Sequence, residues 1–153
     1  MKIIFTRSDK KFSKMIIDIT EEPVSHCAIL IDNAWVIHSN LLGVHVEHIS
    51  TFTKASHILY SVDVPDMPVD KILSNCSYGT YDYGAFIFLG GSLLLRKYFK
   101  NIMPKQNLWQ TTGMFLCTEW ITKNLADKED GMITPYQLYL KLLDKYQSHY
   151  EPI

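Results

Sequence analysis

The sequence has few cysteines, and their spacing excludes the folds that depend on cysteine pairs. The three cysteines stand at positions 27, 76 and 117 and form no CxxC pair. An odd set of widely separated thiols does not build a disulfide framework. We therefore expect free thiols and a reducing compartment.

Long apolar stretches are also missing. The longest apolar run, at 85–95, is broken by Gly90, Gly91 and Ser92, whereas a transmembrane helix needs about 20 consecutive apolar residues. The start of the chain is apolar only at positions 3–5, which is too short for the core of a secretory signal peptide. We therefore predict neither a transmembrane segment nor a signal peptide.

The charges exclude a further class of function. The formal net charge is −1 at pH 7, with no long block of either sign, whereas nucleic-acid-binding domains carry basic patches. The chain also lacks a GxxxxGK[ST] loop, which would bind nucleotide phosphates. We expect no nucleic-acid partner.

What is present is the composition of an ordinary soluble protein. The chain has 153 residues, of which 47% are hydrophobic and 20% charged. These values suit one domain with a core that needs no disulfides. No internal repeat or shift in composition divides the chain, so we predict a single domain over residues 1–153.

The first half of the chain is rich in strand patterns. A strand is predicted at 2–6, followed by a helix that has Ser8 as its N-cap and ends at 21–23, where Pro23 stops it. A meander of four strands is then predicted at 24–31, 34–39, 44–49 and 56–64. The strand at 24–31 is apolar on both faces, which indicates a central position, and the strand at 44–49 is more exposed.

The second half is helical. Helices are predicted at 69–77, from Thr80 or Asp82 to Tyr98, and at 116–126, with a loop at 100–113 and a linker at 127–131. Thr134-Pro135 predicts the start of a last helix. The buried face of that helix is expected to hold Leu138, Leu142, Leu143 and Tyr146. Strands followed by helices predict an α+β fold, with an antiparallel sheet of about four to five strands covered on one side by helices.

One cysteine stands where a thiol becomes reactive. Cys117 lies in the first turn of the helix predicted at 116–126, after a flexible Thr-Thr-Gly at 111–113. The unpaired N–H groups and the positive end of the helix dipole favour a thiolate there. A nucleophilic cysteine also needs a histidine base, which must come from elsewhere in the chain.

His26 and His38 are the candidates for that base and its partner. They lie on consecutive strands and share a face of the hairpin only if the connecting loop has an odd number of residues. We predict a three-residue loop at 32–34, which places His38 opposite Ala28 and diagonal to His26. Cys117 is then the nucleophile, His26 the general base and His38 the group that orients His26. The backbone N–H of Cys117 is the candidate donor to an oxyanion.

Several short motifs occur in an order that is known from one family. They are Ser13-Lys14 with Ile17, Ser25-His26 with Ile29, the His38 strand, Tyr81-Asp82-Tyr83, Phe115-x-Cys117-Thr118-Glu119, and Thr134-Pro135. In these motifs the chain resembles the circularly permuted branch of the NlpC/P60 papain-like superfamily, which includes YiiX-like and lecithin-retinol-acyltransferase-like proteins. Thr118 departs from the YiiX-like pattern, which more often has serine. The third triad residue, here His38, varies across the superfamily.

The resemblance implies a papain-like fold and cysteine-dependent acyl chemistry through an acyl-enzyme, without metal or cofactor. The expected activity is hydrolysis by an amidase or peptidase, or acyl transfer, on a small peptide such as a cell-wall peptide, an amide or a lipid ester. The residues that become candidates for the substrate cleft are Tyr81, Tyr83, Thr118 and Glu119. Small relatives of this kind occur in bacteria and their viruses, so we expect a cytoplasmic or virion-associated protein.

Three alternatives stay open. A lone cysteine on an apolar helix face is usually a small buried hydrophobe, and the chain would then be an inactive binding or virion-assembly module. A zinc site could use His26, His38 and Cys117, with Cys27 as a fourth ligand, but no two of these form a short chelating pair. The run at 86–95 is either a core helix, which we favour, or a peripheral contact with a lipid surface.

The remaining cysteines and histidines are assigned structural roles. Cys27 points away from His26 along its strand and is predicted to lie in the core. Cys76 has no partner nearby in sequence. Solvated or hydrogen-bonded surface positions are expected for His45, His48, His57 and His149.

Overall fold

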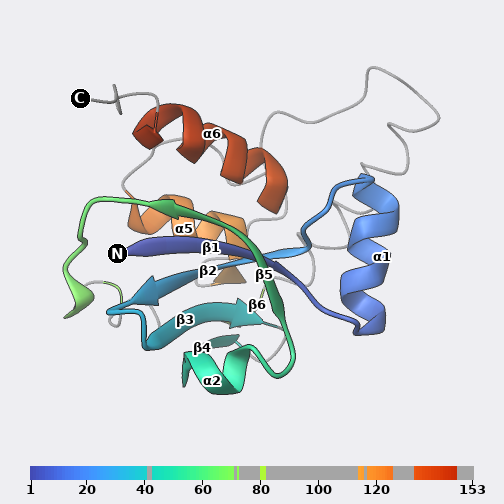
Figure 1. The fold of residues 1–153 in the computed structure, drawn as a ribbon, viewed down its shortest axis with the longest axis horizontal. Helices are drawn as coiled ribbons and strands as arrows, with labels where there is room; N and C mark the ends of the chain where they lie inside the picture. The colour runs from blue at the N-terminus through green and yellow to red at the C-terminus, as the bar shows by residue number, and fades with distance from the viewer. Residues whose placement is uncertain are drawn as a thin grey trace.

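The computed structural model is an α+β protein built on an open antiparallel sheet of five strands in the order β4-β3-β2-β1-β5 (Figure 1). The structure describes residues 1–40, 43–70, 72, 80–81, 114–115, 117–125 and 133–147. The strands are β1 (Lys2–Arg7), β2 (His26–Ile31), β3 (Trp35–Asn40), β4 (Gly43–His48) and β5 (His57–Asp63). The predicted fold class is confirmed at this level, and β2 is the central strand, as predicted.

The prediction of a four-strand meander is wrong for its last strand. β5 does not pair with β4 but crosses to the other edge of the sheet, where Ile3 lies opposite Val62 and Phe5 opposite Tyr60. Between β4 and β5 the chain forms a short helix, α2 (Ile49–Phe52), which was not predicted. The physical reason lies in β1, which is buried at Ile3, Ile4 and Phe5. A strand that is apolar on both faces is unfavourable at an edge, and β5 covers it.

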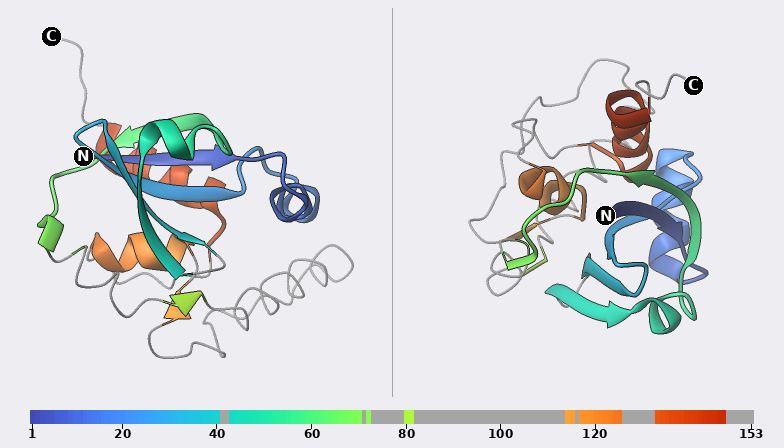
Figure 2. Two further views of the ribbon diagram at one scale, coloured as in Figure 1. Left: turned by 90° about the horizontal axis from the view of Figure 1, so that it is seen from below. Right: turned by 60° about the vertical axis from the view of Figure 1, so that its left-hand side comes forward.

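Helices cover one face of the sheet. α5 (Cys117–Asn124) packs against β2 and β3, and α6 (Pro135–Gln147) packs against β5 and β1. Figure 2 shows both helices on the same side of the sheet and α2 on the other side. Two short parallel strands, β6 (Thr80–Tyr81) and β7 (Met114–Phe115), lie beside β4 and α5 respectively.

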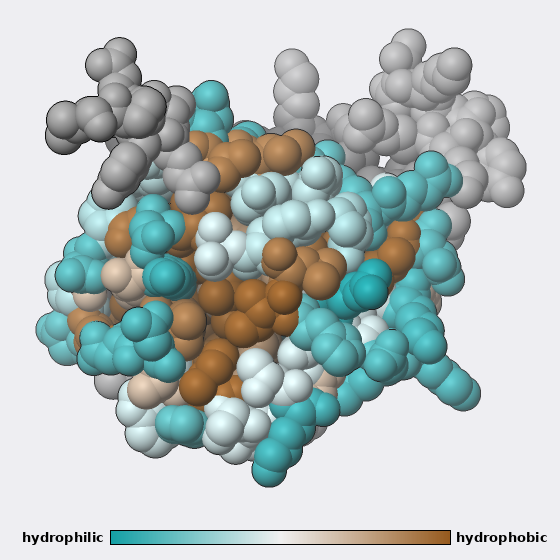
Figure 3. Space-filling model, viewed as in Figure 1, coloured by the Kyte–Doolittle hydropathy of each residue, from teal (hydrophilic) through white to brown (hydrophobic). Residues whose placement is uncertain are grey.

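The alternation of side chains along the strands divides the core between the two faces. The larger cluster lies under α5 and α6 and includes Phe5, Cys27, Ile29, Ile121 and Leu138. The smaller cluster lies on the opposite face and consists of Ile4, Ala28, Leu30, Val36 and Phe52. Figure 3 views the molecule from the side of the smaller cluster, with apolar side chains gathered at its centre. Burial of one large aliphatic side chain stabilises a fold by about 1.5–3 kcal/mol, so the larger cluster fixes α5 on the sheet.

The helix α1 (Lys11–Thr20) begins later than predicted. Its N-cap is Lys10 and not Ser8, and the Lys10 side chain makes no capping hydrogen bond. The backbone N–H of Ser8 instead donates to Ser13 Oγ at 2.9 Å, and this hydroxyl is also 2.5 Å from Ser25 Oγ. The serine at position 8 therefore belongs to a turn that ties α1 to the residue before His26. The predicted end is confirmed, since Glu21 adopts a left-handed conformation with φ of 58°.

The predicted start of the last helix is confirmed. The backbone N–H of Gln137 donates to Thr134 Oγ1 at 3.1 Å, and Gln137 Oε1 accepts from the backbone N–H of Thr134 at 3.2 Å. This reciprocal pair is a capping box. The predicted buried face of α6 holds Leu138 and Leu142, exposed by 2% and 1%, while Leu143 and Tyr146 are half-buried.

Several predictions fall on residues outside the described ones. They are most of the 69–77 helix with Cys76, the helix towards Tyr98 beyond position 81, the 100–113 loop and the 127–131 linker. Thr80 itself lies in β6 and so does not cap a helix there. Among the described residues, none of the helices has the length and apolar character needed to cross a membrane.

Candidate active site

The hairpin of β2 and β3 sets the position of both histidines. Ile31 pairs with Trp35, which leaves a loop of three residues, 32–34. Asp32 and Asn33 adopt left-handed conformations with φ of 50° and 53°. Aspartate and asparagine tolerate the left-handed region better than most other non-glycine residues do. The same register continues to place His38 opposite Ala28, diagonal to His26. The predicted odd loop is confirmed.

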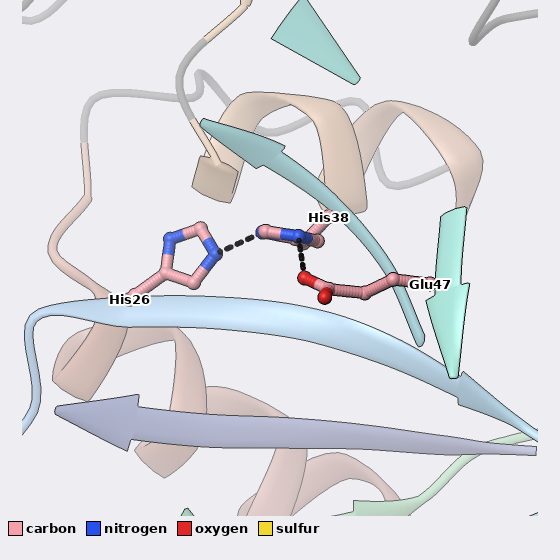
Figure 4. A network of polar contacts seen from close by, with 3 residues as sticks. All are labelled: His26, His38 and Glu47. Carbon is pink, nitrogen blue, oxygen red and sulfur yellow. Dashed lines mark hydrogen bonds and ion pairs between the residues drawn. The ribbon is translucent and has the colours of Figure 1, made fainter. Parts of the chain in front are cut away.

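The two histidines are in direct contact. His26 Nε2 lies 3.2 Å from His38 Nδ1, and the rings meet edge to face with centroids 5.4 Å apart (Figure 4). His26 is the first residue of β2 and His38 lies near the end of β3, so the pair stands at one end of the sheet. The contact between His26 and His38 that the sequence predicted is therefore present.

A third side chain joins the pair. Glu47 extends from β4, and its Oε1 lies 2.9 Å from His38 Nε2 (Figure 4). The register of β3 and β4 puts His45 directly opposite His38, and Glu47 two residues further along the same face. Glu47 is not among the predicted site residues, because the strand at 44–49 is predicted to be more exposed. The signal was present in the alternation of residues along 44–48, which puts His45 and Glu47 on the same face of the strand.

His38 is held in its neutral form. Its side chain is only 9% exposed, and burial is the main cause that lowers the pKa of its ring from 6.5 to about 3. The charge of His26 lowers that pKa further, and the charges of His45 and Lys10 act in the same direction. A neutral ring between a second histidine and the Glu47 carboxylate can donate at one nitrogen and accept at the other.

Cys117 begins α5 and is partly buried against the larger core cluster. Its pKa lies well below that of an ordinary thiol, first because of a hydrogen bond with the Cys27 side chain, and then because of a hydrogen bond with His26 and the charge of that ring. Burial acts in the opposite direction. These interactions favour the thiolate form of Cys117, as the surroundings of reactive cysteines do.

Cys27 has a second role beyond the predicted one. It is fully buried, as predicted for a core residue. Burial also raises the pKa of the Cys27 thiol, and the hydrogen bond and charge of Cys117 raise it further. Cys27 therefore stays protonated, and its side chain favours the thiolate form of Cys117. No sequence pattern indicated this contact, because it depends on how α5 packs on β2.

The other candidate residues are placed as follows. Thr118 is buried, with 2% of its surface exposed. The side chains of Tyr81 and Glu119, and the whole of Tyr83, lie outside what the structure describes. His45 is half-buried, its ring centroid is 6.1 Å from that of His38, and its Nε2 is buried without a hydrogen bond.

Two further histidines occupy the surface positions that the sequence predicted. His48 caps α2 by accepting from the backbone N–H of Ser50. His57 is 3.6 Å from the carboxylate of Asp9.

Among the described residues, no three His, Cys, Asp or Glu side chains are grouped so that they could hold a metal ion. No protein-family model, curated protein or solved structure matches the chain. The function must therefore be argued from the geometry of the site.

Proposed function

We propose that the protein is a cysteine-dependent hydrolase or acyltransferase with Cys117 as nucleophile, His26 as general acid and base, and His38 as the residue that orients His26. The observation that carries this proposal is the convergence of the three groups. The imidazoles are in contact at 3.2 Å, and the hydrogen bond and the charge of His26 lower the pKa of the thiol at the start of α5. The two histidines come from consecutive strands, and the cysteine comes from a helix much further along the chain.

The chemistry follows from the protonation of these groups. The Cys117 thiolate attacks the carbonyl carbon of an amide or ester, and the carbonyl π electrons move to oxygen. When the tetrahedral intermediate collapses, the carbon–nitrogen or carbon–oxygen bond breaks, and the His26 imidazolium gives its proton to the leaving amine or alcohol. The backbone N–H of Cys117, at a helix N-terminus, is the proposed donor to the oxyanion.

A thioester then links the acyl group to Cys117. Neutral His26 takes a proton from water, or from another acceptor such as an alcohol or amine, as that acceptor attacks the thioester carbonyl. The carbon–sulfur bond breaks and the thiolate–imidazolium pair is restored. Water makes the protein a hydrolase, and another acceptor makes it an acyltransferase.

The resemblance to the permuted NlpC/P60 proteins supports the same proposal. The histidine at the start of a strand, the polar partner on the next strand and the cysteine opening a later helix occur here in that order. On this basis we propose a small peptide, an amide or a lipid ester as substrate, and a chemistry that needs no cofactor.

Alkylation of the native protein tests the proposal. Iodoacetamide is applied from pH 5 to pH 9, and mass spectrometry measures the labelling rate of each cysteine in the wild type and in His26→Ala. We expect Cys117 to label fast near neutral pH, well below the ordinary thiol pKa of about 8.5, and His26→Ala to slow this labelling. If Cys117 labels no faster than Cys76 in either protein, the catalytic proposal fails and the inactive binding module becomes the better interpretation.

A further inference from the structure

The polar contacts across β2, β3 and β4 fix which nitrogen carries each proton. An ionised carboxylate only accepts hydrogen bonds. The bond between Glu47 and His38 therefore requires a proton on His38 Nε2. Because His38 is neutral, its Nδ1 has no proton and must accept the bond from His26.

The tautomer of the His26 ring is fixed in the same way. His26 Nε2 must donate to His38 Nδ1, so the proton on Nε2 of His26 is fixed by its partner. The nitrogen of His26 that remains for exchange with a thiol is Nδ1. The order of donors and acceptors thus runs in one direction, from the base at His26 to the carboxylate at Glu47.

We propose that Glu47 is a positioning residue that fixes the ring orientation and the tautomer of His38, and through His38 directs Nδ1 of His26 towards Cys117. This inference rests on the proposed function of the site. Glu47 does not touch the thiol or a substrate, so it is not a catalytic residue.

The surroundings of His38 explain why a carboxylate is needed. The ring is packed edge to face on Phe52, with centroids 5.2 Å apart, and faces the ionisable rings of His26 and His45. The charge of Lys10 also acts on it. These three bases disfavour a proton on His38, and Glu47 is the acid in contact with the ring among the residues that the structure describes. Without that acceptor the buried Nε2–H would lose its partner, which is costly enough to reorient the ring or move its proton.

The test uses two substitutions of Glu47. Glu47→Gln keeps the size of the side chain, but its amide can donate or accept, so it no longer dictates the tautomer of His38. Glu47→Ala removes both the charge and the acceptor. The control is Asp63→Asn, which removes an exposed carboxylate from β5 at the opposite edge of the sheet.

Two measurements are made on each variant. Ring nitrogen NMR shifts report which nitrogen of His38 carries the proton. We expect protonated Nε2 in the wild type and in Asp63→Asn, and a mixture of tautomers in Glu47→Gln. The alkylation rate of Cys117 at pH 7 is expected to fall about tenfold in Glu47→Ala and by less in Glu47→Gln, since hydrogen bonds to charged groups have effects of this size.

The outcomes separate this inference from the proposed function. If His26→Ala slows the alkylation of Cys117 but neither Glu47 variant changes the His38 tautomer or the alkylation profile, Glu47 has no positioning role and the catalytic pair stands. If His26→Ala has no effect on Cys117, the proposed function itself is wrong. Should Glu47→Ala fail to fold, Glu47→Gln alone decides, because unchanged His38 shifts in that variant overturn the inference.

Discussion

Replacing Cys27 by alanine should raise the pKa of Cys117 without removing any residue of the proposed triad. Cys27 is fully buried, and the hydrogen bond from its side chain is the largest of the effects that lower the pKa of the Cys117 thiol. A hydrogen bond to a charged group contributes about 1.5–3 kcal/mol. Because one pKa unit corresponds to about 1.4 kcal/mol, the expected rise is about 1–2 units.

The assay is the rate of Cys117 alkylation as a function of pH. We expect the midpoint of the Cys27→Ala profile to move to higher pH, and the rate below both midpoints to fall about tenfold to a hundredfold. Cys27→Ser keeps an O–H donor at the same position and should stay closer to the wild type. Thermal unfolding of each variant checks that the core is intact.

A wild-type midpoint in Cys27→Ala would refute the reasoning. The thiolate would then be stabilised by His26 and by the start of α5 alone, and the pair of thiols would be a packing contact. A shift of equal size in Cys27→Ser would also refute it, since the effect would follow from the changed volume and not from the lost donor.

Two further predictions concern stability. Since the pKa of His38 is about 3 in the folded protein against 6.5 ordinarily, the unfolded chain binds more protons between these values. The free energy of unfolding should therefore fall as the pH drops from 6.5 to 3, by up to about 1.4 kcal/mol per pH unit from this residue. Urea unfolding at several pH values should show a flatter dependence in His38→Gln but not in His57→Gln, and parallel curves would contradict the assignment. Thr134→Ala removes one hydrogen bond of the α6 capping box and should lower the free energy of unfolding by about 1 kcal/mol. Thr134→Ser keeps the hydroxyl and should retain most of that free energy. Equal losses in both variants would show that the hydroxyl does not matter.

The sequence was sufficient where one local signal decides the structure. Thr134 followed by Pro135 fixes the start of α6, because the side chain and the ring each suit one helical position. The face shared by His26 and His38 followed from the parity of one loop. The cysteine in the first turn of α5 was likewise visible, because dipole and capping effects act within that turn.

The sequence was insufficient where a partner is chosen at long range. Nothing in the pattern of 56–64 says that the strand pairs with β1, because both edges of the sheet offer the same backbone groups. The contact of Glu47 with His38 could not be predicted for the same reason, since it depends on the pairing of β3 with β4. Ser8 looked like a cap because its type suits one, yet its backbone N–H bonds to Ser13.

The strand that carries Glu47 has a consequence for how the site responds to mild destabilisation. β4 is an edge strand of the five-stranded sheet and pairs, within the described part of the chain, with β3 alone, whereas β2 is paired on both sides. Strands with fewer partners open locally at a lower free energy than the global unfolding of the protein. The amide protons of β4 should therefore exchange with solvent faster than those of β2, and each such opening detaches Glu47 from His38 while the core beneath α5 and α6 stays folded. The reactivity of the site is thereby linked to the fraying of one edge of the sheet.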